Sequence, residues 1–218
     1  MAATFDAAAS SGFQFTTTSI PATNITVGSG SNRIAVLALF MSINNASGIT
    51  VSIGGVSATL VAASDTGTSL AQRTMIWLAF NPPSGAQTFT ASWTGSCNAD
   101  LGCVTMSGAS QTVGDHVGSF TFHTGANPAT LSLTITSANG DLTSTIGFTL
   151  NAYAGSGTNQ TLKWGIDSTE AGGDIGPGTG NTTHTWTDQL TNQDMLISGV
   201  NVKAASVSDV LMGAMLSG

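Results

Sequence analysis

The chain has 218 residues, of which 41% are hydrophobic and only 7% carry a charge. Ordinary soluble domains are about 25% charged, so an apolar chain like this one is expected to fold around a packed core rather than stay disordered. Four Lys and Arg residues against eleven Asp and Glu residues give a net charge of −7, which excludes the basic surface that binding to nucleic acid or an anionic membrane requires.

The residue types favour strands over helices. The chain has one glutamate, Glu170, and two lysines, Lys163 and Lys203, whereas Glu and Lys are the usual residues at exposed helix positions. Threonine and valine are frequent, and 27 glycines separate the segments. We therefore predict an all-β protein with a single antiparallel domain over residues 1–204, followed by an apolar tail at residues 205–218.

Alternation and turn signals predict short strands along the whole chain. They are expected at residues 13–19, 33–41, 49–53, 58–63, 73–80, 87–93, 103–107, 117–123, 130–136, 142–151, 161–166, 183–187 and 195–203. In residues 130–136, Leu131, Leu133 and Ile135 alternate with hydroxyl residues, which predicts one buried and one solvated face. Residues 34–41 are apolar throughout, which predicts a central strand. Short strands spaced in this way are typical of a sandwich or a jelly roll.

Two cysteines lie close together in the sequence. Cys97 and Cys103 flank the segment NADLG, which we interpret as a hairpin loop between two strands. Across so short a loop the two side chains could face each other at disulfide distance. The bond would suit oxidising surroundings, whereas two free thiols would suit a reducing cytosol, and the spacing leaves both open.

Residues 170–181, EAGGDIGPGTGN, are predicted to form a long glycine-rich loop. Asp167, Glu170 and Asp174 lie in or beside this loop and could offer oxygen ligands to Ca²⁺. A solvated acidic loop without an ion is the simpler interpretation, so we expect no metal and no other cofactor.

The sequence contains no local motif of an enzyme. A GxSxG nucleophile elbow and the metal motif HExxH are both absent. His116, His123 and His184 are expected on loops or strand ends that face solvent, although spacing alone does not decide this, because triads assemble in space. One glutamate and scattered aspartates single out no carboxylate pair for glycoside hydrolysis. We predict that the chain is not an enzyme.

Four stretches occur in a characteristic order: VGSGSNRIAVLALF, ITVSIGGVSATLV, RTMIWLAFNPPSGAQTFTASWTGS and CVTMSGASQTVG. Their order resembles the jelly-roll module of phage structural proteins and large bacterial surface proteins. The corner ASQT at residues 109–112 departs from the VDQT-like corner of that module, while ANGDLTSTIGFTLNA resembles its second half. The resemblance covers residues 4–203 and implies a jelly-roll β-sandwich of two antiparallel sheets without catalytic residues.

These observations predict a structural function. The expected protein is a non-enzymatic phage virion protein, either a capsid decoration or a fibre or tail component, which contacts copies of itself and a capsid or tail protein. A cyclic homo-oligomer is expected, because closed symmetry satisfies every interface. The tail either closes the sandwich or docks on a neighbouring chain through its large apolar residues, Val210, Leu211, Met212, Met215 and Leu216.

The expected location is the virion exterior. The first residues have neither the positive charge nor the continuous apolar stretch of a signal peptide, so synthesis in a host cytoplasm and release by lysis are expected. The alternative function is a carbohydrate-binding or adhesive surface module. Trp186, which has polar neighbours in THTWTDQ, is its candidate sugar platform, and packing of Trp186 in the core is the competing interpretation.

Overall fold

The computed structural model describes residues 1–42, 46–65, 72–124, 130–149, 153–155, 160–165, 171–188 and 194–206. These residues form antiparallel strands in three hydrogen-bonded sheets, with one short 3₁₀ turn, η1 (Val113–Asp115). The prediction of an all-β antiparallel protein is confirmed. Among the described residues, no helix is long and apolar enough to span a membrane.

The first sheet is organised around one long strand, β8. Its strands are β1 (Thr4–Ser10), β2 (Gln14–Val27), β3 (Ile34–Ser42), β4 (Ser47–Ile53), β5 (Val56–Ser57), β6 (Thr59–Asp65), β7 (Arg73–Phe80) and β8 (Gly85–Ser107). The first part of β8 pairs with β2 and β4, and the second part pairs with β1 and β3. The sheet therefore folds over along β8, and the path β5-β4-β8-β3-β7-β6 curls into a nearly closed barrel around a buried apolar cluster.

The second and third sheets come from the rest of the chain. Their strands are β9 (Gly118–His123), β10 (Thr130–Thr136), β11 (Leu142–Thr149), β12 (Tyr153–Gly155), β13 (Thr161–Trp164), β14 (Ala171–Pro177), β15 (Asn181–Asp188) and β16 (Met195–Val202). The second sheet has the order β13-β14-β11-β16-β9, and the third has the order β10-β15-β12.

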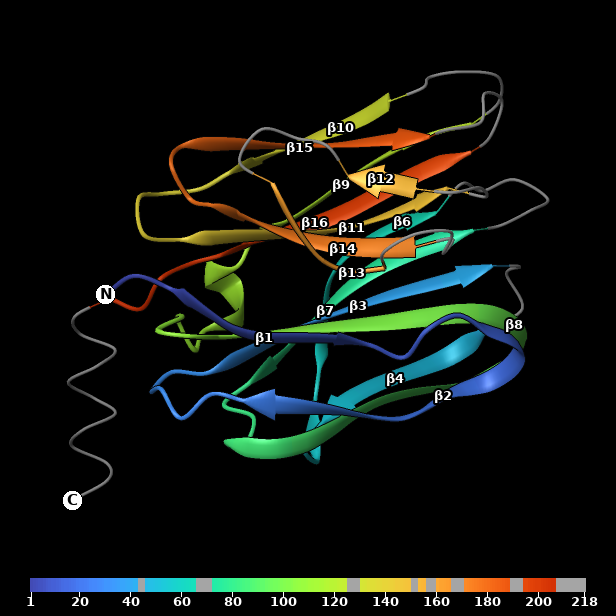
Figure 1. Cartoon of the computed structure of the whole chain (residues 1–218), viewed down its shortest axis with the longest axis horizontal. Coiled ribbons are helices and arrows are strands. Elements are labelled where there is room, and N and C mark those ends of the chain that lie inside the picture. Colours follow the sequence, from blue (N-terminus) through green and yellow to red (C-terminus); the bar gives the residue numbers. More distant parts are fainter. Residues whose placement is uncertain are drawn as a thin grey trace.

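The sheets stack in layers, as Figure 1 shows, with β10, β15 and β12 at one end and β2 and β4 at the other. One apolar cluster lies inside the curled first sheet, a second lies between the first and second sheets, and a third lies between the second and third sheets. In the middle cluster, the ring of Phe40 on β3 stacks on Phe148 of β11, with centroids 3.9 Å apart. Every residue of β3 is buried, which confirms the prediction of a central strand. The two-sheet sandwich that the resemblance implied is wrong, because three sheets form this stack.

The predicted glycine-rich loop is wrong over residues 171–177, which form the buried strand β14 between β13 and β11. Trp164 explains why glycine is needed in this region. A Cβ added at Gly173 would lie 2.1 Å from the indole nitrogen of Trp164, and one at Gly102 would lie 1.9 Å from a ring carbon of the same indole. The glycines therefore make room for a buried tryptophan between sheets and do not mark a turn.

Candidate functional site

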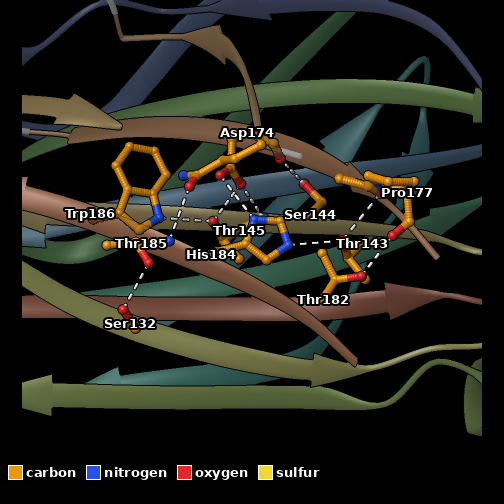
Figure 2. A network of polar contacts seen from close by, with 12 residues as sticks. Ser132, Thr143, Ser144, Thr145, Asp174, Pro177, Thr182, His184, Thr185 and Trp186 are labelled. Carbon is orange, nitrogen blue, oxygen red and sulfur yellow. Dashed lines mark hydrogen bonds and ion pairs between the residues drawn. The ribbon is translucent and has the colours of Figure 1, made fainter. Parts of the chain in front are cut away.

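A buried polar network joins the third sheet to the second (Figure 2). In β14, one carboxylate oxygen of Asp174 lies 3.0 Å from Nδ1 of His184, which is on β15. The other oxygen accepts hydrogen bonds from the backbone N–H (3.1 Å) and the hydroxyl of Thr145, on β11. The indole N–H of Trp186 donates to that same hydroxyl at 3.0 Å. Three strands, β11, β14 and β15, are thus tied to one carboxylate.

The far side of the His184 ring contacts a second hydroxyl. Nε2 lies 2.8 Å from Oγ1 of Thr143, and Oγ1 also lies 3.2 Å from the carbonyl oxygen of Gly176. The hydroxyl has a single proton, and the carbonyl can only accept. Both contacts are hydrogen bonds when Nε2 donates to Oγ1 and Oγ1 donates to Gly176. The His184 ring thus bridges the Asp174 carboxyl group and the Thr143 hydroxyl.

A carboxylate, an imidazole and a hydroxyl in this order also occur in hydrolytic triads. Here, however, Asp174, His184 and Thr143 each have an exposed fraction of 0%. A nucleophile needs a path for its substrate, and a fully buried hydroxyl that already bonds a carbonyl has none. The arrangement is therefore a structural clamp between sheets. The expectation that the histidines face solvent is wrong for His184, and also for His116, which is 5% exposed.

A second polar cluster holds the end of β16. Both oxygens of Asp141 accept hydrogen bonds, from the backbone N–H groups of Ala138 and Ala204 at 2.8 Å and from the amide nitrogen of Asn201 at 3.0 Å. The amide oxygen of Asn201 is buried and has no hydrogen-bond partner.

His116 fastens the same region to the loop before β9. Its Nδ1 accepts the backbone N–H of Lys203 at 3.3 Å, and its Nε2 lies 3.0 Å from the carbonyl oxygen of Ser110. The first contact requires an unprotonated Nδ1, so the proton of the neutral ring is on Nε2. Burial lowers the pKa of His116, which favours this neutral form.

Of the three predicted Ca²⁺ ligands, the structure describes only Asp174. Asp174 is buried against His184 and Thr145, while Asp167 and Glu170 lie outside the described residues. No group of three His, Cys, Asp or Glu side chains suitable for a metal occurs in the described part of the chain.

The cysteine prediction is wrong in its geometry. Cys97 and Cys103 lie within the single strand β8 and not on either side of a hairpin loop, and both are free, buried thiols. Six residues along an extended strand span about 20 Å, far beyond the length of a disulfide. Burial raises the pKa of Cys97 to about 11 and raises the pKa of Cys103 as well, so neither thiol is a ready nucleophile.

The candidate sugar platform is also wrong. Trp186 is 0% exposed and packs in the cluster between the second and third sheets, so its ring cannot stack on a sugar. The predicted assembly residues of the tail, Val210, Leu211, Met212, Met215 and Leu216, lie outside the described residues.

One side of the layered stack has open strand edges. In the described chain, β6, β9 and β10 are each the last strand of a sheet, and β9 contacts both of the others. The hydroxyl of Ser64 in β6 lies 3.4 Å from the carbonyl oxygen of Thr121 in β9. We call this side the β6–β9–β10 flank. Phe120 and Phe122 of β9 are 56% and 46% exposed on it.

A groove runs between β9 and β10 on this flank. Its volume is about 410 Å³. It is lined by Val117, Ser119, Thr134, Ile135, Thr136, Ser137, Ala138, Asp141, Asn201 and Lys203. Val117, at its entrance, is 60% exposed, and the partnerless amide oxygen belongs to Asn201 in its wall. Sequence reasoning missed this flank. The available signal in the sequence was the alternation of phenylalanine and polar residues in SFTFH, which predicts a strand with one apolar face. In the structure this apolar face is exposed to solvent.

No family model matches the chain, and no curated protein matches it. Among solved structures, the chain is similar to HutD from Pseudomonas fluorescens SBW25, solved in a formate condition. The identity is 12%, the match covers 86% of this chain and 77% of HutD, and the TM-score is 0.28. We withdraw the resemblance to the jelly-roll module of phage structural and bacterial surface proteins, because the described strands form three sheets with a nearly closed barrel and not a sandwich of two sheets.

Proposed function

We propose that the chain is a non-enzymatic structural protein that assembles with copies of itself through the β6–β9–β10 flank. The observation that supports this is the exposure of Phe120 and Phe122 on an open strand edge. Large aromatic side chains are enriched at the centres of protein interfaces, and burying each of them against a partner removes a large apolar area from water.

The residue types on the strands of the flank also support a contact with another copy. Natural proteins guard open edges with charged residues, proline or bulges, because an unpaired edge invites another chain. Strands β9 and β10, with the sequences GSFTFH and TLSLTIT, contain no Lys, Arg, Asp, Glu or Pro. In β6, the one charged residue is Asp65, which already pairs with Arg73 at 2.6 Å. β6 also has a register shift between Leu60 and Ala62, so β9 and β10 are the strands of the flank without such protection.

The outer face of the third sheet suggests the surroundings of the assembly. Its hydroxyl groups bond across the strands, Ser132 to Thr185 at 2.8 Å and Thr134 to Thr183 at 2.9 Å. A charge-poor, hydroxyl-rich face suits a protein that works outside the cell. We propose the virion exterior as its location, with a capsid or tail protein as a further partner.

The test is the molar mass of the full chain in solution, measured by light scattering over a range of concentrations. The wild type is expected to form a defined oligomer, and the double variant Phe120→Lys, Phe122→Lys is expected to be monomeric. Phe15→Lys is the matched control, because Phe15 is 73% exposed on β2, which is not part of the flank, and the oligomer should survive this change. A monomeric wild type, or an oligomer that withstands the double change, would refute the proposal.

A further inference from the structure

The groove between β9 and β10 has the chemistry of a site for an extended apolar segment. Val117 and Ala138, which are both exposed, supply apolar surface to the groove. The groove lies between β9 and β10, which are each the last strand of a sheet. An extended segment fits such a groove, because it can lie along end strands and contact the apolar wall between them.

The sequence contains one segment that matches this groove. Residues 207–218, VSDVLMGAMLSG, include large apolar residues and a single charged residue, Asp209. They make up 12 residues beyond the described part of the chain, which ends at Ser206. Fully extended, such a segment reaches about 40 Å, which is enough to cross from one molecule to the next.

The end of the described chain leads away from its own groove. Lys203 lines the groove, but the next residues turn toward the end of the first sheet, where Ala204 bridges to Ala109. There, the backbone N–H of Ala205 donates to Gly108 at 2.8 Å, and the amino group of Met1 donates to the carbonyl oxygen of Ala205 at 3.2 Å. The segment after Ser206 therefore starts outside the groove of its own molecule.

We propose that residues 207–218 of one copy dock in the β9–β10 groove of a second copy. This inference rests on the proposed function, since it names the contact that joins two copies. The segment would lie against the face of β9 that carries Ser119. Phe120 and Phe122, on the opposite face of β9, remain available to pack against the body of the neighbour.

Cysteine cross-linking between two different full-length chains tests this contact. One chain carries Ser119→Cys in the groove, and the other carries Met212→Cys in the segment. The native thiols Cys97 and Cys103 are buried and have raised pKa values, so they do not compete under mild oxidation. The expected product is a covalent dimer of the two different chains. Val113→Cys replaces Ser119→Cys in the control, because Val113 is 44% exposed but does not line the groove.

A second variant tests the groove without cross-linking. Val117→Asp places a charge at the exposed entrance and should shift the dissociation midpoint of the oligomer to at least tenfold higher concentration, whereas Val113→Asp should leave it unchanged. If no mixed dimer forms, or if Val113→Cys cross-links as readily as Ser119→Cys, the docking is refuted. The proposed function stands in that case if the wild type is still an oligomer that Phe120→Lys with Phe122→Lys disrupts. A monomeric wild type refutes both.

Discussion

Replacing Asp174 by alanine tests whether the buried carboxylate is a structural clamp. The change leaves three buried donors without an acceptor: the backbone N–H and hydroxyl of Thr145 and Nδ1 of His184. Each unsatisfied buried donor costs about 1–3 kcal/mol. Partial relaxation reduces the sum, so the expected loss is about 3–5 kcal/mol, in the lower part of the range for three donors. For a chain of this length, that loss lowers the melting temperature by roughly 6–20 °C.

The free energy of unfolding is measured by urea denaturation, with tryptophan fluorescence as the probe. Trp186 reports on the clamp directly, because its indole N–H bonds the same Thr145 hydroxyl. Thr134→Ala is the matched control: it removes a hydroxyl pair on the exposed face, where the expected loss is within about 0.5 kcal/mol. A loss below about 1 kcal/mol for Asp174→Ala would show that the network does not hold the sheets together.

Three further predictions concern other buried groups. Gly102→Ala places a Cβ 1.9 Å from a ring carbon of Trp164, so calorimetry should show a loss of about 1–3 kcal/mol or more, and an unchanged melting temperature would contradict this packing. Burial raises the pKa of Asp100, so its stabilising contribution is present below its ordinary pKa and is lost as the pH rises through the raised value. The Asp100→Asn variant should therefore gain stability relative to the wild type between pH 4 and pH 7, as measured by urea unfolding. Burial lowers the pKa of His116, so its contribution to stability is present above the ordinary pKa of about 6.5 and is lost as the pH falls through the lowered value. His116→Gln should therefore reduce the loss of unfolding free energy on the acid side. An unchanged slope of unfolding free energy against pH would count against this role.

The strand content could be predicted because residue type alone carries that information. Glu and Lys, the usual residues at exposed helix positions, are nearly absent, and β3 was correctly placed at the centre because it is apolar on both faces. The hydroxyl alternation of β10 correctly predicted that Leu133 and Ile135 are buried while Ser132 and Thr134 point outward. These are local signals, and they hold wherever one face of a strand meets water.

Two buried strand segments were predicted as turns or loops because they contain glycine and polar residues. Residues 94–102 contain Gly95, Asn98 and Asp100 and were interpreted as a break between two strands, yet they continue β8. The glycines of β14 were interpreted as turn residues, yet Gly173 makes room for Trp164. In both cases the reason for the residue is a contact with another strand, so no pattern within the strand itself could reveal it.

The stacking of layers explains both the missed clamp and the flank. In the second sheet both faces are covered, so polar residues of β11 such as Thr143 and Thr145 are buried rather than solvated. Two buried polar residues of this sheet find partners on another layer: Thr143 contacts His184 of the third sheet, and Ser198 of β16 bonds Thr74 of β7 at 2.9 Å. Thr145 bonds Asp174 within the second sheet and accepts the indole N–H of Trp186 from the third. Such partners satisfy the faces of the sheets, whereas Phe120 and Phe122 of the end strand β9 stay exposed. The proposed contact with a second copy would bury these two side chains.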